Sequence, residues 1–332
     1  MTIEHGGALD RAIARFGGTR ADWLDLSTGI NPEAFPLPEI APEIWNRLPD
    51  ESLLTQALDA ARGYYGAADT AAIVAAPGTQ ALIQIVPELV APGEVAILSP
   101  TYQEHHVAFA RAGWAVVPCA DVGSVPATAK AVVVVNPNNP DGRIVPGGEL
   151  LALAERLGRH GGFLVVDEAF ADAHPEVSVA GEAGYDHLIV LKSFGKFFGL
   201  AGLRLGFAIS GAEIVRKLAE RLGPWAVSGP ALAIAAHAFA SGPVLNDFRE
   251  RIAARRDRLS AIFQRTGIEE IGGTALFALI RHRQAHVLHE ELCRRHILTR
   301  KFDYEREWLR IGLAAHEADF NRLEQAFKDI RA

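Results

Sequence analysis

The sequence predicts an α/β protein in which a mostly parallel sheet lies between helices. Short, fully apolar runs such as 131–135 are typical of buried parallel strands. These runs alternate with helical segments such as 150–159, and strands that alternate with helices of this length form parallel sheets covered on both faces. From about residue 245 the pattern changes to long charged helices around a short strand, which predicts a second, smaller α+β domain.

Each element has its own signal along the chain. Residues 1–50 carry many Gly and Pro and few periodic stretches, so we expect an arm and loops there. We expect sheet strands over 73–76, 95–98, 131–135, 163–166, 188–191 and 205–209. We expect helices over 52–65, 78–90, 103–112, 150–159, 247–265, 285–295 and 317–330, with a further strand near 275–280. The expected domains are an N-terminal arm with part of the small domain (1–50), a large domain (51–240) and a small C-terminal domain (241–332).

Composition narrows the class of function. A chain of 332 residues with 49% hydrophobic and 22% charged residues has the balance of a soluble globular enzyme. Its net charge of -7 argues against nucleic-acid binding. We find no apolar run long enough for a membrane span and no signal-peptide pattern, so we expect a cytoplasmic protein. The two cysteines, Cys119 and Cys293, predict neither a disulfide framework nor a metal site.

Lys196 is the first candidate for chemistry. It lies among glycines and apolar residues, with Ser193 three positions before it and Arg204 eight positions after it. A desolvated amine loses its proton more easily, and only the neutral amine attacks an aldehyde. Ser193 and Arg204 could hold a phosphate nearby. Taken alone, Lys196 could equally be a structural lysine at a strand end.

Further candidates follow the predicted strands. In a parallel sheet, ligands bind at the carboxyl ends of the strands, where Gly78, Tyr102, Asn139 and Asp167 are expected beside Lys196. The stretch from Gly78 through Thr79 and Gln80 opens a helix, whose free N–H groups suit a phosphate. A carboxylate at the end of an apolar strand, such as Asp167, needs a partner.

Five motifs, in order along most of the chain, resemble those of the class I/II aminotransferase superfamily, the fold-type I enzymes that use pyridoxal 5′-phosphate (PLP). They are Gly78-Thr79-Gln80, Pro100-Thr101-Tyr102, Asn136-Pro137-Asn138-Asn139-Pro140-Asp141-Gly142, Val165-Val166-Asp167-Glu168-Ala169-Phe170 and Trp308-Leu309-Arg310-Ile311-Gly312. The stretch around Lys196 is similar to the family's cofactor-lysine motif. The resemblance implies a seven-stranded, mostly parallel sheet in the large domain.

The resemblance also implies a role for each matching residue. Lys196 would bind PLP covalently and carry a proton at the substrate Cα, and Asp167 would pair with the pyridine nitrogen. The other expected cofactor contacts are Gly78, Thr79, Gln80, Tyr102, Asn139, Ser193 and Arg204. Arg310 would bind the substrate carboxylate bidentately.

The chain departs from the family pattern at two positions near the cofactor. Phe170 stands where many relatives have a tyrosine that donates to the ring oxygen, so we expect a different pKa for the lysine–cofactor linkage. Leu48 stands where a tyrosine of many relatives reaches the cofactor phosphate of the other subunit, and no site role is assigned to it. The two-subunit active site of the family implies a homodimer.

The N-terminal region resembles one branch of this superfamily, the threonine-phosphate decarboxylases of cobalamin biosynthesis. The matching stretches are His5-Gly6-Gly7 and Asp25-Leu26-Ser27-Thr28-Gly29-Ile30-Asn31-Pro32. The implied substrate contacts are His5, Gly6, Asn31, Asn139, Arg300 and Arg310. Arg300 resembles the arginine that binds a side-chain phosphate, so the expected substrate is a small phosphorylated amino acid.

Other functions fit parts of the pattern. An aminotransferase acting on histidinol phosphate or a related amino acid would use the same two arginines, and the motifs separate it poorly from a decarboxylase. A binding protein that had lost catalysis would not need Lys196, Asp167, Asn139 and Arg310 together. A nicotinamide-dependent dehydrogenase is disfavoured because no Gly-x-Gly-x-x-Gly follows the first strand. Among the histidines, either His105 or His106, just after Tyr102, is expected to line the site.

Overall fold

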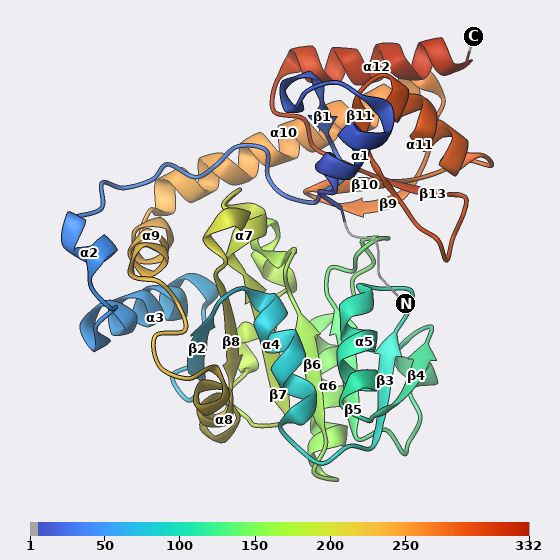
Figure 1. Cartoon of the computed structure of the whole chain (residues 1–332). Helices are drawn as coiled ribbons and strands as arrows, with labels where there is room; N and C mark the ends of the chain where they lie inside the picture. Colours follow the sequence, from blue (N-terminus) through green and yellow to red (C-terminus); the bar gives the residue numbers. More distant parts are fainter. Residues whose placement is uncertain (1–5, 332) are drawn as a thin grey trace. The chain divides into compact units, whose positions relative to one another are not determined.

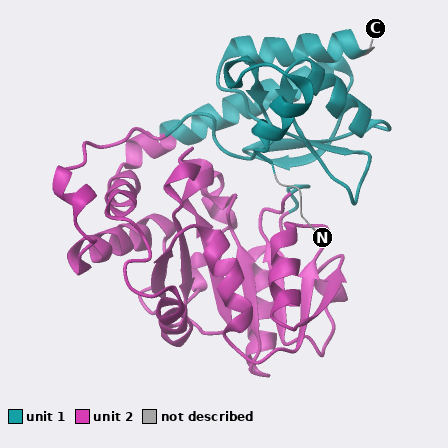
Figure 2. Ribbon diagram, viewed as in Figure 1, with its two compact units in different colours: residues 1–34, 140–143, 247–332 teal, residues 35–139, 144–246 magenta. Residues whose placement is uncertain are grey.

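The protein comprises two compact units in a computed structural model that describes residues 6–331 (Figure 2). The larger unit consists of residues 35–139 and 144–246. The smaller unit consists of the chain up to residue 34, residues 140–143 and the chain from residue 247 on. Among the described residues, no helix has the length and apolar character needed to cross a membrane.

The larger unit is built on a seven-stranded sheet (Figure 1). Its strands are β2 (Ala72–Ala76), β3 (Glu94–Leu98), β4 (Ala115–Cys119), β5 (Ala131–Val135), β6 (Phe163–Asp167), β7 (Leu188–Ser193) and β8 (Gly206–Ser210). Their order across the sheet is β2-β8-β7-β6-β5-β3-β4. Six strands run in the same direction, and β8 runs opposite to them. The predicted mostly parallel, seven-stranded sheet is therefore confirmed.

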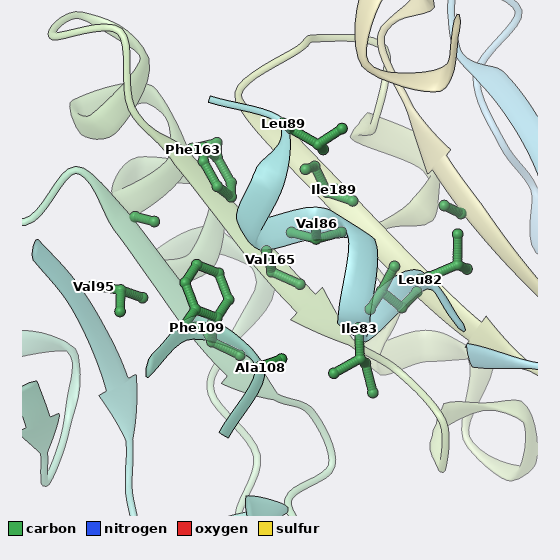
Figure 3. Packing of buried hydrophobic residues seen from close by; sticks show 14 of the residues in the cluster. Leu82, Ile83, Val86, Leu89, Val95, Ala108, Phe109, Phe163, Val165 and Ile189 are labelled. Atoms are coloured by element: carbon green, nitrogen blue, oxygen red, sulfur yellow. The ribbon is translucent and has the colours of Figure 1, made fainter. Parts of the chain in front are cut away.

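Helices cover both faces of this sheet. The helices that lie wholly in the larger unit are α2 (Pro42–Asn46), α3 (Glu51–Tyr65), α4 (Thr79–Ile85), α5 (Gln103–Arg111), α6 (Gly147–Gly158), α7 (Phe194–Phe197), α8 (Ala212–Leu222) and α9 (Gly229–Phe239). Leu82 of α4 and Phe109 of α5 pack with Val165 and Ile189 of the central strands (Figure 3). Because strand side chains alternate between faces, Val166 and Val190 belong to the opposite face, which is also buried.

The smaller unit has two short sheets and four helices in the described part of the chain. A four-stranded antiparallel sheet has the order β12 (Arg300–Lys301), β13 (Trp308–Gly312), β10 (Phe277–Arg281) and β9 (Glu269–Thr274). Strands β1 (Leu24–Asp25) and β11 (Ile297–Leu298) form a parallel pair. The helices are α1 (Leu9–Phe16), α10 (Gly242–Thr266), of which the first residues belong to the larger unit, α11 (Ala285–Arg294) and α12 (Glu317–Arg331).

Some elements differ from the sequence prediction for identifiable reasons. The helix expected over 78–90 ends at Ile85 and continues as a 3₁₀ turn over Val86–Glu88, because Pro87 has no N–H to donate. Strand β4 was not predicted; it contains Pro118, which a sheet tolerates at its edge, and β4 is an edge strand.

The compact units have bounds of their own, and the predicted domains 1–50, 51–240 and 241–332 stay a prediction. Residues 35–50 belong to the larger unit, where α2 packs on α9 so closely that a Cβ on Gly229 would lie 2.8 Å from the Ile44 carbonyl oxygen. Residues 140–143 belong to the smaller unit, where the Gly273 N–H donates to the Asp141 carbonyl at 2.9 Å.

Candidate active site

Four predicted site residues lie at one edge of the larger sheet. Tyr102 follows β3, Asn139 follows β5, Asp167 ends β6 and Lys196 follows β7. These four strands are neighbours and run parallel, so their carboxyl ends share one edge. Ligands of open α/β sheets bind at this edge.

Asp167 is a buried carboxylate with a defined partner. Its side chain is 4% exposed, and its Oδ2 lies 2.8 Å from Nε2 of His105, whose side chain is 1% exposed. Its Oδ1 accepts a hydrogen bond from the Ala169 N–H at 3.1 Å. Both oxygens are therefore oriented, which offsets part of the cost of burying the carboxylate.

His105 is the one of the two candidate histidines that reaches the Asp167 carboxylate. It lies three residues after Tyr102 near the start of α5, and the two rings meet edge to face with centroids 6.2 Å apart. The i, i+3 spacing was visible in the sequence, but the contact with Asp167 depends on how α5 packs on the sheet.

Lys196 lies on the single-turn helix α7, directly after β7. Its Nζ is 5.9 Å from the ring centroid of Phe170. The neighbouring side chains Phe194 and Phe197 are buried. A Cβ on Gly195 would lie 2.8 Å from Cα of Ala201, so a glycine is needed to pack this turn against the next segment.

The residues expected to hold a phosphate are brought together at the start of α4. A Cβ on Gly78 would lie 2.9 Å from Nη2 of Arg204, and Gly78 has a φ of +83° that favours glycine. Ser193 pairs with Gly206 between β7 and β8, and a Cβ on Gly206 would lie 2.6 Å from the Thr79 backbone nitrogen. The backbone at Gly78 and Thr79 therefore lies beside Arg204 and beside Gly206, the strand partner of Ser193.

Gln80, the residue after Thr79, forms a hydrogen-bonded chain with Tyr102 and Glu104. The Tyr102 hydroxyl donates to Oε1 of Gln80 at 3.1 Å. Nε2 of Gln80 in turn donates to Oε2 of Glu104 at 2.8 Å. These bonds fix the Tyr102 ring in place. Asn139, which is half-buried, lies in the turn after β5.

Three of the predicted substrate residues come together in the smaller unit. Arg310 is buried, its Nη2 donates to the Ser27 carbonyl at 2.7 Å, and its guanidinium lies 4.9 Å from the ring centroid of Phe277. A Cβ on Gly6 would lie 3.4 Å from the same Nη2. Arg300 is the register partner of Arg310 between β12 and β13, so the two arginines are neighbours.

A pocket of about 100 Å³ in the smaller unit contains Gly6, Ser27 and Arg300 among its lining residues. The two further predicted substrate residues of the N-terminal region are Asn31 and His5. Asn31 is buried, and its Oδ1 accepts from the Glu33 N–H at 3.1 Å. His5 lies outside the residues that the structure describes.

Comparison with known proteins places the chain in a family. Residues 22–326 match the family model of aminotransferase class I and II. A threonine-phosphate decarboxylase of Sinorhizobium sp is 48% identical over 330 residues, which cover 98% of this chain and 97% of that protein. A threonine-phosphate decarboxylase of Pseudomonas aeruginosa is 44% identical over 326 residues, covering 98% and 97%.

A solved structure shows the same fold. Histidinol-phosphate aminotransferase from Sinorhizobium meliloti, in complex with pyridoxal-5′-phosphate, superposes with a TM-score of 0.83 at 20% identity and covers 99% of this chain and 96% of that one. The fold and the resemblance expected from the sequence are both confirmed. This chain belongs to the aminotransferase class I and II family.

Proposed function

We propose that this chain catalyses the PLP-dependent decarboxylation of L-threonine O-3-phosphate to (R)-1-amino-2-propanol O-2-phosphate. The observation that carries the proposal is its near full-length similarity to two relatives named threonine-phosphate decarboxylase. The resemblance stated above implies that the product becomes the aminopropanol linker of cobalamin. The adjacent Arg300 and Arg310 support a substrate with two anionic groups.

The residues present fit PLP. Asp167 offers a buried carboxylate to a pyridinium nitrogen, and the missing Cβ of Gly78 lets the backbone approach the Arg204 guanidinium closely. When bound, PLP supplies a cationic ring that accepts the electron pair released from a bond at the substrate Cα. We assign the phosphate of PLP to the backbone around Thr79, to Ser193 and to Arg204.

Asp167 and His105 would act as a unit. The Asp167 carboxylate would keep a proton on the pyridine nitrogen, because a nearby negative charge favours the charged form of the ring. The 2.8 Å contact with His105 holds that carboxylate in one orientation. Asn139 would donate to the ring oxygen, and Tyr102 would stack on the ring face. Phe170 has no hydroxyl, so it cannot donate the hydrogen bond to that oxygen that a tyrosine would donate in many relatives.

Lys196 would bind the cofactor covalently until the substrate amine displaces it, and its side chain, once protonated, would then deliver a proton to the substrate Cα. Arg310 would bind the substrate carboxylate and Arg300 the phosphate, with His5, Gly6 and Asn31 as further substrate contacts. The bond that breaks is the one held perpendicular to the cofactor ring. For decarboxylation, the bond between Cα and the carboxylate must therefore be held in this orientation. We assign this role to Arg310.

We also propose that the protein is a cytoplasmic homodimer. The exposed large apolar side chains of the larger unit include Leu37, Trp45, Leu48 and Trp225. Three of them lie within the twelve residues 37–48. Large apolar side chains gathered in one exposed segment are typical of protein–protein interfaces.

Product analysis of the PLP-loaded protein tests the function. With L-threonine O-3-phosphate and no 2-oxo acid, mass spectrometry should detect aminopropanol phosphate. If that product is absent, and histidinol phosphate instead transfers its amino group when a 2-oxo acid is present, the protein is an aminotransferase and the decarboxylase proposal is wrong.

A further inference from the structure

A buried ion pair lies directly beside two proposed catalytic residues. Glu168 follows Asp167 in the chain, and Lys192 lies four residues before Lys196. Nζ of Lys192 contacts Oε2 of Glu168, and the two side chains are only 3% and 0% exposed for lysine and glutamate. The pair has no role in the functions assigned above.

Both members of the pair form further hydrogen bonds with neighbouring groups. Oε1 of Glu168 accepts from the Val179 N–H at 2.8 Å, and the Ser178 hydroxyl donates to Oε2 at 2.5 Å. Nζ of Lys192 also donates to Oγ of Ser178 at 2.9 Å and lies 4.9 Å from the ring centroid of Tyr65. The three N–H groups of this ammonium thus meet a carboxylate, a hydroxyl and an aromatic face.

The pair joins β6 and β7 just beyond the end of their ladder. In the ladder Asp167 is the register partner of Leu191, and the Glu168 N–H donates to the Leu191 carbonyl at 2.9 Å. After that bond the next side chains, Glu168 and Lys192, meet each other. Ser178 and Val179 bind the same carboxylate and add a third segment to the junction.

The pair and the Asp167–His105 contact lie on opposite faces of the sheet. Ile189 and Leu191 pack in the cluster beneath α4 and α5, so the alternation of β7 directs Lys192 to the other face, where Tyr65 of α3 contacts it. On that face burial, and then the charge of Asp172, raises the pKa of Tyr65. Lys192 is a buried cation that lies beside both Tyr65 and Glu168.

Stability alone does not account for such a pair. Burying two charges costs about as much as their attraction returns, and apolar residues of similar volume often serve equally well. A fixed geometry between two neighbouring strand ends is a different requirement. We infer that Glu168 and Lys192 are positioning residues, which hold the ends of β6 and β7 so that Asp167 and Lys196 keep their separation.

This inference rests on the proposed function, because it assumes that Lys196 binds PLP. Its test compares Glu168→Gln, Lys192→Met and the charge-free double variant in the PLP-loaded protein. The control is the exposed pair Arg221–Glu88, changed to Met and Gln in the same way. Circular dichroism and thermal unfolding report whether each variant folds.

The first measurement is the pH midpoint at which the absorbance of bound PLP changes. Glu168→Gln leaves the Lys192 cation uncompensated, which should lower the midpoint; Lys192→Met leaves a buried carboxylate and should raise it. The double variant should return close to the wild-type midpoint. This readout needs no substrate, so it stands even if decarboxylation is not the activity.

The second measurement separates kcat from KM. A displacement of about 1 Å can cost about 100-fold in rate, so the double variant should lose about that factor in kcat while KM, set by Arg300 and Arg310, stays within about twofold. The control pair should change neither. Two results together would overturn the inference: single variants that leave the midpoint unshifted, and a double variant that keeps the wild-type kcat. The pair would then have a purely structural role.

Ser178→Ala provides a milder variant if the charge variants fail to fold. It removes the hydroxyl that contacts both Glu168 and Lys192 and leaves both charges in place. We expect a folded protein with kcat lowered about tenfold, since one charge-assisted hydrogen bond contributes on the order of that factor. A folded Ser178→Ala protein with wild-type kcat and midpoint would contradict the positioning role.

Discussion

Arg300 is the residue on which the substrate assignment depends most. It is the register partner of Arg310, and its guanidinium lies 5.4 Å from the ring centroid of Phe302. Replacing it with glutamine should lower kcat/KM for L-threonine O-3-phosphate about 30- to 150-fold, because a phosphate loses a charge-assisted partner worth about 2–3 kcal/mol. Lys301→Gln, on the next residue, is the matched control.

Comparing substrates makes the Arg300 test specific. Any turnover of unphosphorylated L-threonine should change much less, because that amino acid has no phosphate to lose a contact. Steady-state kinetics of both substrates with both variants measure the difference. Equal losses for the two substrates in Arg300→Gln would reject the phosphate role.

Single residues of the site were predictable where a motif carries them. Lys196, Asp167 and Gly78 stand in short stretches whose glycines and strand ends are visible in the sequence. The partners of these residues were not predictable with the same detail. His105 reaches Asp167 across 62 positions, and Lys192 reaches Glu168 across 24, so each contact depends on how separate elements pack.

At the scale of elements, helix α11 and the strands after it hold a histidine that couples stability to pH. Nδ1 of His289 lies 2.9 Å from the Thr299 hydroxyl. Burial, followed by the charges of Lys301, His286 and Arg15, lowers the pKa of His289 to about 4. The charge of Glu290 acts in the opposite direction but does not cancel this effect.

The direction of the pH effect follows from that pKa. An unfolded histidine has a pKa of about 6.5, so between about 6.5 and about 4 the unfolded chain binds the extra proton. Proton binding by the unfolded chain lowers the free energy of unfolding. The stability that the neutral, buried His289 contributes is therefore present above pH 6.5 and is lost as the pH falls towards 4. Chemical unfolding at pH 7, 5.5 and 4.5 should show a shallower pH dependence for His289→Gln than for the wild type.

The exposed His160 gives the control for that experiment. His160→Gln should keep the wild-type slope, since it removes an exposed side chain and leaves the buried surroundings of His289 unchanged. If His289→Gln and the wild type lose stability in parallel, His289 does not contribute this pH dependence.

The helices and strands differed in how well they could be predicted from the sequence. The central strands β5 and β6 are continuous apolar runs, because helices cover both of their faces, and they were predicted within one residue. Strand β4 has an exposed start and Pro118 in its edge position, so its pattern is weak. Strand β9 contains Gly272 and Gly273, which weaken the strand pattern in the sequence. A glycine is needed at 272 because a Cβ there would lie 2.2 Å from the Asp141 carbonyl oxygen.

At the scale of the whole molecule, the proposed dimer makes a direct prediction. Light scattering should give about twice the chain mass of 35.8 kDa. Replacing Trp45 and Leu48, each 66% exposed, with glutamate should shift the protein towards the monomer, because charges placed in an apolar interface lose their solvation. Tyr185→Glu, at another exposed apolar residue, is the control.

A monomeric wild type at micromolar concentration would contradict the dimer and leave the cofactor residues of the larger unit unaffected. The sequence could suggest the dimer only through the family resemblance. It indicated two domains by the change of pattern near residue 245, whereas the assignment of residues 140–143 to the smaller unit depends on a backbone contact between distant segments.

The fate of two labelled atoms tests the decarboxylase assignment most directly. L-Threonine O-3-phosphate carrying ¹³C in its carboxyl group and ¹⁵N in its amino group is incubated with the PLP-loaded protein and an unlabelled 2-oxo acid as amino acceptor, and the products are measured by mass spectrometry. We predict that ¹³C leaves as CO₂ while ¹⁵N remains in aminopropanol phosphate. Retention of ¹³C in a phosphorylated 2-oxo acid, with loss of ¹⁵N from it, would contradict the assignment and establish amino transfer.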